Sequence, residues 1–332
     1  MQFGQLKRRE LITLLGGAAA SWPLAARAQQ PGKVVRIGFL GTASASGYAS
    51  QVEGFRLGLR DLGYVEGTNL IIEYRWAQGN YARLPQLAAE LIHSNVELIV
   101  THGTPGSFAA KQATTTIPIV VALAGDPVAA GIVTSLARPG GNITGQSFFA
   151  PELDAKRIEL VKELMPRMTR VAALVNPDNP SNIGPELRAM ETAAQSLKLN
   201  LQQVAVRGPN EFESAFERIE QEHADAVVVS DDGMLIANFE TIAALAAKRR
   251  FVSIGFKEFA QAGGLMGYGV DFFAAYRRAA VFVDRVLKGG KPADIPIEQA
   301  TKFEFVINFK AAKALGVTVP ASLLVRADVV IE

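Results

Sequence analysis

Polar side chains that could hold a small molecule follow directly after several predicted strands. They are hydroxyls, a glycine, carboxylates, an amide and a histidine: Thr42, Ser44, His102, Gly103, Thr104, Asp126, Asn176, Asp231 and Asp232. Hydroxyls, backbone N–H groups and helix N-termini suit a carboxylate, while an aspartate accepts hydrogen bonds from an amine or a hydroxyl. Because ligands of open α/β sheets bind just outside the carboxyl ends of the strands, we expect a binding site here. The three aspartates also fit a second interpretation, as helix caps or turn residues.

Aromatic residues could supply stacking surfaces for the same ligand. The candidates are Tyr48, Trp76, Phe256 and Tyr268. For Trp76 and Phe256, simple packing in the core is the competing interpretation.

Residues for catalysis or metal binding are not grouped in this sequence. There is no cysteine, which removes thiol catalysis, disulfides and zinc–thiolate sites. His93 and His223 fall near predicted helix ends and are expected to be exposed, whereas His102 is a candidate for lining a cleft. The nucleophile elbow, the phosphate loop and the His-Glu-x-x-His motif are missing, and Gly38–Gly41 lacks the spacing of a dinucleotide loop. We therefore expect a protein that is not an enzyme and uses no cofactor or metal.

The elements that would position these residues repeat along the chain. Each half alternates apolar strand segments with helical patterns, which is typical of βαβ units and parallel sheets. The predicted strands of the first half are 36–40, 70–76, 96–101 and 117–123, and those of the second half are 170–175, 199–206, 226–229 and 251–255. Matching strands are about 130 residues apart. The pattern therefore predicts two Rossmann-like lobes, each a parallel sheet flanked by helices, facing one site.

The segments outside this repeat indicate how the lobes are joined. Residues 138–145 contain three glycines and one proline, which favours a connection between lobes. Near the end, a glycine-rich strand is predicted at 263–271, followed by a long helix through Leu287. Phe303, Phe305, Ile307 and Phe309 alternate as in a strand with one buried face. Because one lobe does not need all these elements, we expect the chain to cross between lobes more than once.

The first 28 residues are typical of an export signal. Lys7-Arg8-Arg9 precedes a short apolar stretch, and Ala26-Arg27-Ala28 offers a small-x-small cleavage site. The order Arg-Arg-x-Leu-Ile resembles the twin-arginine motif, although the general export route and an amphipathic first helix are alternatives.

The whole chain of 332 residues has a formal charge of +2. Residues 1–28 contribute +3 of it, so the remainder carries −1 and nucleic acid is not expected as a partner.

Several motifs spread along the chain resemble one known family. They are Gly63-Tyr64-Val65-Glu66-Gly67, Glu73-Tyr74-Arg75-Trp76, Thr114-Thr115-Thr116-Ile117-Pro118-Ile119-Val120, Gly125-Asp126-Pro127, Arg138-Pro139-Gly140-Gly141-Asn142, Val175-Asn176-Pro177 and Ala311-Ala312-Lys313-Ala314-Leu315-Gly316, together with the leader. The sequence thus resembles ABC-transporter substrate-binding proteins related to the tryptophan/tyrosine-binding group, with a type I periplasmic-binding fold. The resemblance implies two lobes with three crossovers. The expected first lobe is 34–143 plus about 272–298, and the second is 144–271 plus about 299–332.

The resemblance also implies a function. Such a protein captures a small molecule between its lobes, delivers it to an ABC permease of the inner membrane and performs no chemistry. By analogy with amino-acid binders, Thr42, Ser44, Gly103 and Thr104 would hold a carboxylate. Asp231 or Asp232 would hold an amine. We expect a soluble periplasmic monomer, and an aromatic amino acid is one hypothesis for the ligand. Service to a sensor and activity as an exported enzyme are alternatives, whereas a DNA-binding regulator would need a helix-turn-helix where the export signal stands.

Overall fold

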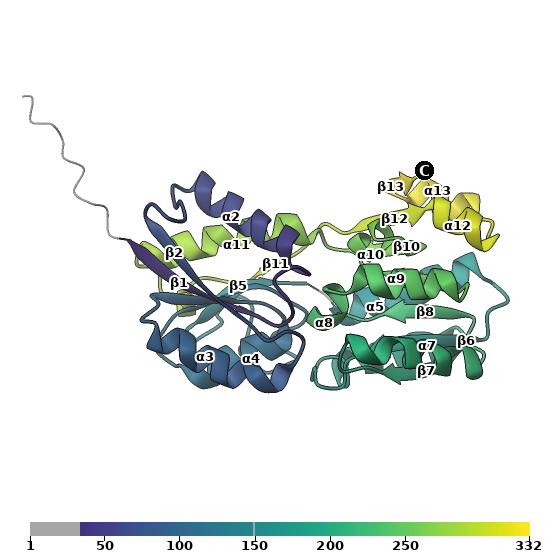
Figure 1. Ribbon diagram of the computed structural model, residues 1–332, viewed down its shortest axis with the longest axis horizontal. Coiled ribbons are helices and arrows are strands. Elements are labelled where there is room, and N and C mark those ends of the chain that lie inside the picture. Colours follow the sequence, from purple (N-terminus) through teal and green to yellow (C-terminus); the bar gives the residue numbers. More distant parts are fainter. Residues whose placement is uncertain (1–33, 149) are drawn as a thin grey trace, which may run out of the picture. The chain divides into compact units, whose positions relative to one another are not determined.

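The computed structural model describes residues 34–148 and 150–332, and these form two α/β lobes (Figure 1). The predicted export signal at 1–28 lies outside the described residues. No helix in the described ranges is both long enough and apolar enough to cross a membrane.

The first lobe is built on a six-stranded sheet in which every pair is parallel. In spatial order its strands are β11 (Glu298–Gln299), β5 (Ile143–Ser147), β4 (Ile119–Ala124), β3 (Leu98–Thr101), β1 (Val35–Gly41) and β2 (Leu70–Trp76). Its helices are α2 (Ala49–Asp61) and α11 (Phe272–Leu287) on one face, with α3 (Leu84–His93) and α4 (Gly103–Ala113) on the other (Figure 1). A short helical turn, η1 (Tyr81–Arg83), leads into α3.

The second lobe contains a seven-stranded sheet that is parallel except between β10 and β12. The spatial order is β13 (Val329–Ile331), β12 (Glu304–Asn308), β10 (Met266–Gly269), β9 (Val252–Gly255), β8 (Ala226–Val229), β6 (Arg170–Val175) and β7 (Asn200–Ala205). The longer helices are α5 (Ala150–Leu164), α6 (Pro185–Ser196), α7 (Phe212–Gln221) and α9 (Phe239–Lys248). The shorter ones are α8 (Gly233–Ile236), α10 (Lys257–Gln261), α12 (Phe309–Leu315) and α13 (Ala321–Arg326).

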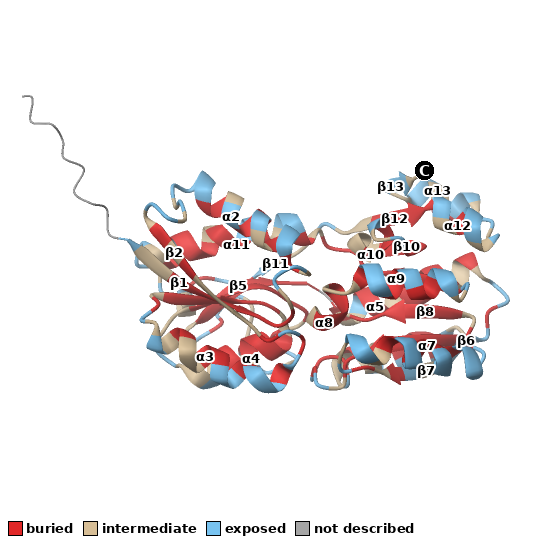
Figure 2. Ribbon diagram, viewed as in Figure 1, coloured by how far each residue is buried: buried red, intermediate tan, exposed pale blue. Residues whose placement is uncertain are grey.

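Burial explains why the predicted strands were recognisable in the sequence. Strands β3, β4, β8 and β9 are buried along their whole length, because helices cover both faces of each sheet (Figure 2).

The packing of the first lobe requires two glycines on α2. A Cβ at Gly58 would lie 2.2 Å from the carbonyl oxygen of Arg277, and one at Gly54 would lie 2.6 Å from that of Phe273. The absence of these side chains lets α11 lie against α2.

The chain passes between the lobes three times. The passages lie between β5 and α5, between β10 and α11, and between β11 and β12. The expected two-lobe α/β fold with several crossovers is therefore confirmed. The crossovers matter for the site, because they bring residues near 148 and 272 to the junction of the lobes.

Two details of the sequence interpretation were wrong. The segment 138–145 was expected to be a connection, but Ile143–Ser147 is the fully buried strand β5 of the first sheet. The glycines that suggested a loop are concentrated before it, and the boundary at 143/144 therefore cuts through a strand of the first lobe. The strand near 303–309 was expected to bury one face. Val306 on the opposite face is also buried, because β12 lies inside the sheet between β10 and β13, and Phe309 is exposed at the start of α12.

Candidate functional site

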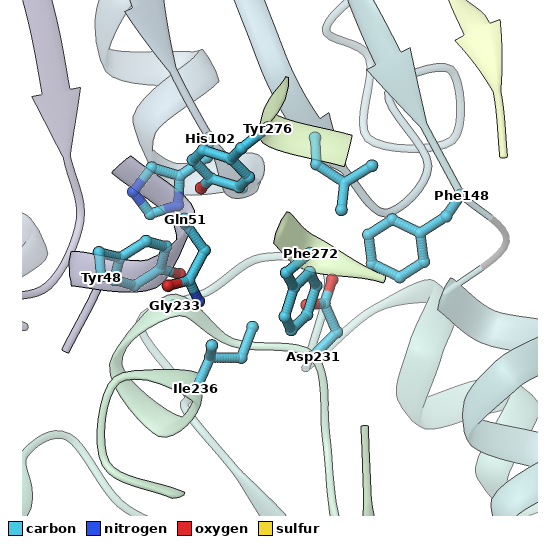
Figure 3. A pocket seen from close by; sticks show the side chains of 11 residues that line it. Tyr48, Gln51, His102, Phe148, Asp231, Gly233, Ile236, Phe272 and Tyr276 are labelled. Atoms are coloured by element: carbon cyan, nitrogen blue, oxygen red, sulfur yellow. The ribbon is translucent and has the colours of Figure 1, made fainter. Parts of the chain in front are cut away.

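A small enclosed cavity lies where the strand ends of the two lobes meet (Figure 3). Its volume is about 20 Å³, enough for roughly one water molecule. The residues that line it are Tyr48, Gln51, His102, Gly103, Leu123, Phe148, Asp231, Gly233, Ile236, Phe272 and Tyr276. Two wider grooves flank the junction of the lobes, with volumes of about 510 and 450 Å³. The lobes are thus closed around the cavity and open to solvent on either side of it.

His102 forms the first-lobe side of the cavity as a neutral group. It precedes α4 and its ring lies 4.3 Å from the ring of Tyr48, centroid to centroid. The backbone N–H of Thr42 donates to Nε2 at 3.2 Å, so that nitrogen is an acceptor. Burial lowers the pKa of His102 to about 3, which keeps the imidazole uncharged at neutral pH. This wall therefore offers the N-terminus of α4 and hydroxyl groups, but no cationic side chain.

Asp231 supplies the acidic wall on the second-lobe side. Asp231 is half-buried, and its carboxylate points into the cavity beside Phe272 (Figure 3). Neither carboxylate oxygen accepts a hydrogen bond from residues 34–148 or 150–332, whereas the backbone carbonyl accepts from Asn179 and Asn182. Burial raises the pKa of Asp231 to about 8, and the nearby carboxylate of Asp154 adds to that effect.

Asp232, the next residue, has a different role. Its side chain caps α8 by accepting from the backbone N–H groups of Met234 and Leu235. It also accepts from Tyr81 at 2.8 Å and from Asn176 and Asn179 at 3.2 and 3.1 Å. The capping interpretation therefore holds for Asp232, and the cavity-facing carboxylate is that of Asp231.

Direct contacts between the lobes surround the cavity. The Tyr81–Asp232 hydrogen bond joins η1 to α8, and the hydroxyls of Thr104 and Ser181 share a hydrogen bond of 2.7 Å. Close approach of Gly233 to the side chain of Thr42 adds to these contacts. A Cβ at Gly233 would lie 2.2 Å from Oγ1 of Thr42, so this position has no room for a side chain while the lobes are closed.

A cluster of buried charges lies in the second lobe behind Asp231. Asp154 and Arg157 on α5 are fully buried and paired with each other, and Glu186 on α6 is 1% exposed. Burial raises the pKa of Asp154 to about 6, and it raises the pKa of Glu186 well above its ordinary value. Within the described ranges, no three histidine, aspartate or glutamate residues are arranged to hold a metal ion. A metal site among the described residues therefore does not account for these charges.

Some of the candidate residues predicted from the sequence do not line the cavity. Ser44 is half-buried and accepts from the backbone of Gly47 at 3.1 Å, and Asp126 accepts from Val128 and Ala129 in a turn. Phe256 is buried beneath the guanidinium of Arg157, 3.9 Å from its ring centre.

The other predicted residues are dispersed around the site. Tyr268 lies in β10, near Phe303 and Phe305. Thr42, Thr104 and Asn176 are buried behind the lining. Trp76 is packed against Tyr74, and His93 and His223 are exposed as expected.

Most of the apolar lining could not be predicted from the sequence. Phe148, Phe272 and Tyr276 come from the crossovers and from α11, so no strand end marks them in the sequence. Asp154 and Arg157 did leave a signal. They fall on the buried side of α5 among Leu153, Ile158 and Val161, where a charged pair is unexpected.

The chain matches known proteins over nearly its whole described length. Residues 37–331 match the family model for ABC transporter substrate binding proteins. A tyrosine-binding protein of Clostridioides difficile (strain R20291) is 28% identical over 264 residues, which cover 79% of this chain and 75% of that protein.

Solved structures give a similar result. A conserved domain protein from Vibrio cholerae O1 biovar El Tor is 27% identical with a TM-score of 0.83, covering 90% of this chain and 100% of that one. The structure of an ABC domain in complex with L-Trp from Streptococcus pneumoniae is 28% identical with a TM-score of 0.79, covering 89% and 100%. The protein belongs to the ABC transporter substrate-binding family, whose members are typically extracytoplasmic, bind a small molecule for a transporter and are not enzymes.

Proposed function

We propose that this protein is a periplasmic monomer that captures an amino acid with an aromatic side chain and delivers it to an ABC permease of the inner membrane. The observation that carries this proposal is the cavity-facing carboxylate of Asp231, which has no hydrogen-bonding partner among the described residues while aromatic rings surround it. The tyrosine-binding relative and the L-Trp complex support the ligand class.

Each part of such a ligand matches a different wall of the cavity. The ammonium group pairs with Asp231, which is the anionic group in the lining. The carboxylate lies toward the N-terminus of α4, where the backbone N–H groups that begin at Gly103 have no partner in the preceding turn. The side chain lies against Phe148, Phe272 and Tyr276, because aromatic rings pack well in offset or edge-to-face arrangements.

Ligand entry requires the lobes to separate. A cavity of about 20 Å³ is far below the roughly 300 Å³ at which ligand pockets begin. The Tyr81–Asp232 and Thr104–Ser181 hydrogen bonds hold the lobes together directly. The ligand then stabilises a closed arrangement only to the extent that it binds that arrangement better than the open one.

Calorimetric titration with L-tryptophan, L-tyrosine, L-phenylalanine and L-leucine tests the ligand class. We expect at least one aromatic amino acid to bind in the micromolar range or tighter, and Asp231→Asn to weaken it at least 100-fold. The matched control is Asp61→Asn, which removes an exposed carboxylate on α2 and should leave the affinity unchanged. If none of the four amino acids binds, the proposed ligand class is wrong.

Delivery is tested with the permease reconstituted in lipid vesicles. We expect ATP hydrolysis and ligand uptake to rise only when both this protein and its ligand are present. If binding is normal but no permease encoded beside it responds, the transport role is wrong.

A further inference from the structure

Two buried carboxylates and a half-buried one lie around a single guanidinium behind the cavity. Asp154, Arg157 and Glu186 are each no more than 1% exposed, and the carboxylate of Asp231 completes the group at the cavity wall. Removing this many ionised carboxylates from water is costly unless each has a close positive partner. The arrangement therefore has an excess of acid over base.

The guanidinium does not pair with all three acids. Arg157 donates from Nη1 to Asp154 and from Nε to the backbone oxygen of Tyr268 at 2.9 Å. Among the described residues, its Nη2 and the Oδ2 of Asp154 have no hydrogen-bonding partner, although both are buried. Glu186 accepts only from the neutral amide of Asn182. Two of the three carboxylates thus lack a contacting cation.

Glu186 and Asp231 approach each other at the face of the first lobe. A Cβ at Gly125 would lie 3.2 Å from Oε1 of Glu186 and 3.3 Å from Oδ2 of Asp231. The glycine places its backbone against both oxygens without adding a side chain. Two carboxylates in one buried site do not both ionise easily, because like charges disfavour each other.

We propose that this cluster holds protons when the cleft has no ligand, and that the ammonium group of an entering ligand displaces one proton from Asp231 to solvent. Glu186 keeps its proton throughout, and Arg157 remains the fixed counter-ion of Asp154. The ligand class that satisfies the site is a primary amine in its cationic form. This inference rests on the proposed function, because it requires an amine ligand.

The groups that face the cluster from all neighbouring elements are consistent with this assignment. They are Asp232 from α8, Tyr48 from the start of α2, Tyr276 from α11, Tyr81 from η1 and His102 from the start of α4. The three tyrosines have pKa values raised mainly by burial, and the histidine is neutral. None of them supplies a positive charge, so the ligand must bring it. Burial raises the pKa of both Asp231 and Glu186, in the direction that proton storage requires.

Calorimetry in buffers of different ionisation enthalpy counts the protons released. With L-tryptophan or L-tyrosine at pH 7, we expect close to one proton released per ligand bound. Affinity should rise about tenfold between pH 6 and pH 7, as one displaced proton requires. The deaminated analogues, indole-3-propionate and 3-(4-hydroxyphenyl)propionate, should release none and bind at least 100-fold more weakly.

Glu186→Gln tests whether the displaced proton comes from Asp231. Because Glu186 stays neutral throughout, its replacement by a neutral amide should leave proton release at pH 7 close to one per ligand. A release below one half would place the displaced proton on Glu186 and overturn the assignment to Asp231. The matched control is Glu191→Gln, which changes an exposed glutamate on the same helix and should release one proton like the unaltered protein.

The outcomes separate this inference from the proposed function. If an aromatic amino acid binds with no proton release and with an affinity independent of pH, the inference is overturned while the function stands. If no probe binds, the ligand class fails, and carbon-13 NMR titration of the carboxyl groups in the ligand-free protein decides. A carboxyl that titrates above pH 6.5 and disappears in Asp231→Asn supports the proton store, whereas titration of all three below pH 5 overturns it.

Discussion

The hydroxyl of Tyr81 in the first lobe donates a 2.8 Å hydrogen bond to Oδ2 of Asp232 in the second lobe. The same hydroxyl accepts from the backbone N–H of Met234 at 3.1 Å. The phenol of Tyr81 therefore links the first lobe to the first turn of α8 in the second lobe. This link lies next to Asp231, which lines the cavity. These bonds exist only while the lobes are closed, so they bias the equilibrium toward closure.

Tyr81→Phe should weaken ligand binding about tenfold. The bond to an ionised carboxylate contributes on the order of 1–2 kcal/mol to the closed arrangement, and the apparent affinity falls with the closed population. Small-angle scattering should show the ligand-free protein more open. Tyr64→Phe is the matched control, because Tyr64 donates to Asp284 at 3.0 Å within the first lobe. An equal loss of affinity in both variants would contradict the bridging role.

Gly47→Ala should prevent full closure. A Cβ at Gly47 would lie 2.5 Å from the Cβ of Ala237 and 2.7 Å from its carbonyl oxygen, across the junction of the lobes. We expect ligand affinity to fall at least tenfold, with the unfolding temperature of the ligand-free protein within 2 °C of the unaltered protein, because each lobe is unchanged. Ser46→Ala, at an exposed position in the same loop, should affect neither quantity. A normal scattering profile for ligand-bound Gly47→Ala would show that the contact yields without opening the lobes.

The two sheets could be predicted from the sequence because their central strands are buried on both faces. Segments such as Ala226–Val229 are continuous apolar runs followed by polar residues, and the run itself marks the strand. Ile143–Ser147 was missed because its strand is short and contains Gly145, which signals a loop when read locally. Pairing with β4 decides its conformation, and that contact is not local in the sequence.

The candidate site was predicted in part, because some of its residues directly follow strands. Asp231 and His102 follow strands and could be recognised as polar residues at a sheet edge. Phe148 and Phe272 could not, because they reach the cavity only through the crossings of the chain between lobes. The sequence could also not show that Asp231 lines the cavity while Asp232 caps α8. It depends on which of the two side chains turns toward α8.

Arg157→Met should destabilise the fold strongly at alkaline pH. It leaves the carboxylate of Asp154 buried without a cation, which costs about 3–5 kcal/mol when a buried pair is broken from one side. Because burial raises the pKa of Asp154 to about 6, protonation should remove much of this loss at pH 5. Urea unfolding at pH 5 and pH 8 measures both values. Lys156→Met, a half-exposed position on the same helix, should change stability little, and the pair Asp154→Leu with Arg157→Met should recover most of the loss.

The pH dependence of ligand-free stability reports on the same carboxylates. A carboxyl whose folded pKa lies above its unfolded pKa binds more protons in the folded state, so stability falls as pH rises from the unfolded value toward the folded one. For Asp231 this window runs from about 4 to about 8. His102 acts in the opposite sense from about 3 to about 6.5, because its folded pKa is depressed.

Between pH 6.5 and pH 8 His102 no longer contributes to this balance, whereas Asp231 and Glu186 do, together with Glu258 on α10, whose pKa burial raises to about 7. We expect the free energy of unfolding to fall by about 1 kcal/mol or more per pH unit across that interval, since one proton corresponds to about 1.4 kcal/mol per unit. Denaturant unfolding at pH 6.5, 7.25 and 8 gives the slope. Asp231→Asn should reduce the slope by about 1 kcal/mol per pH unit, because the amide cannot titrate while Glu186 still holds its proton, whereas Asp61→Asn should retain the full slope. A slope that is the same in all three proteins would place the titrating group elsewhere.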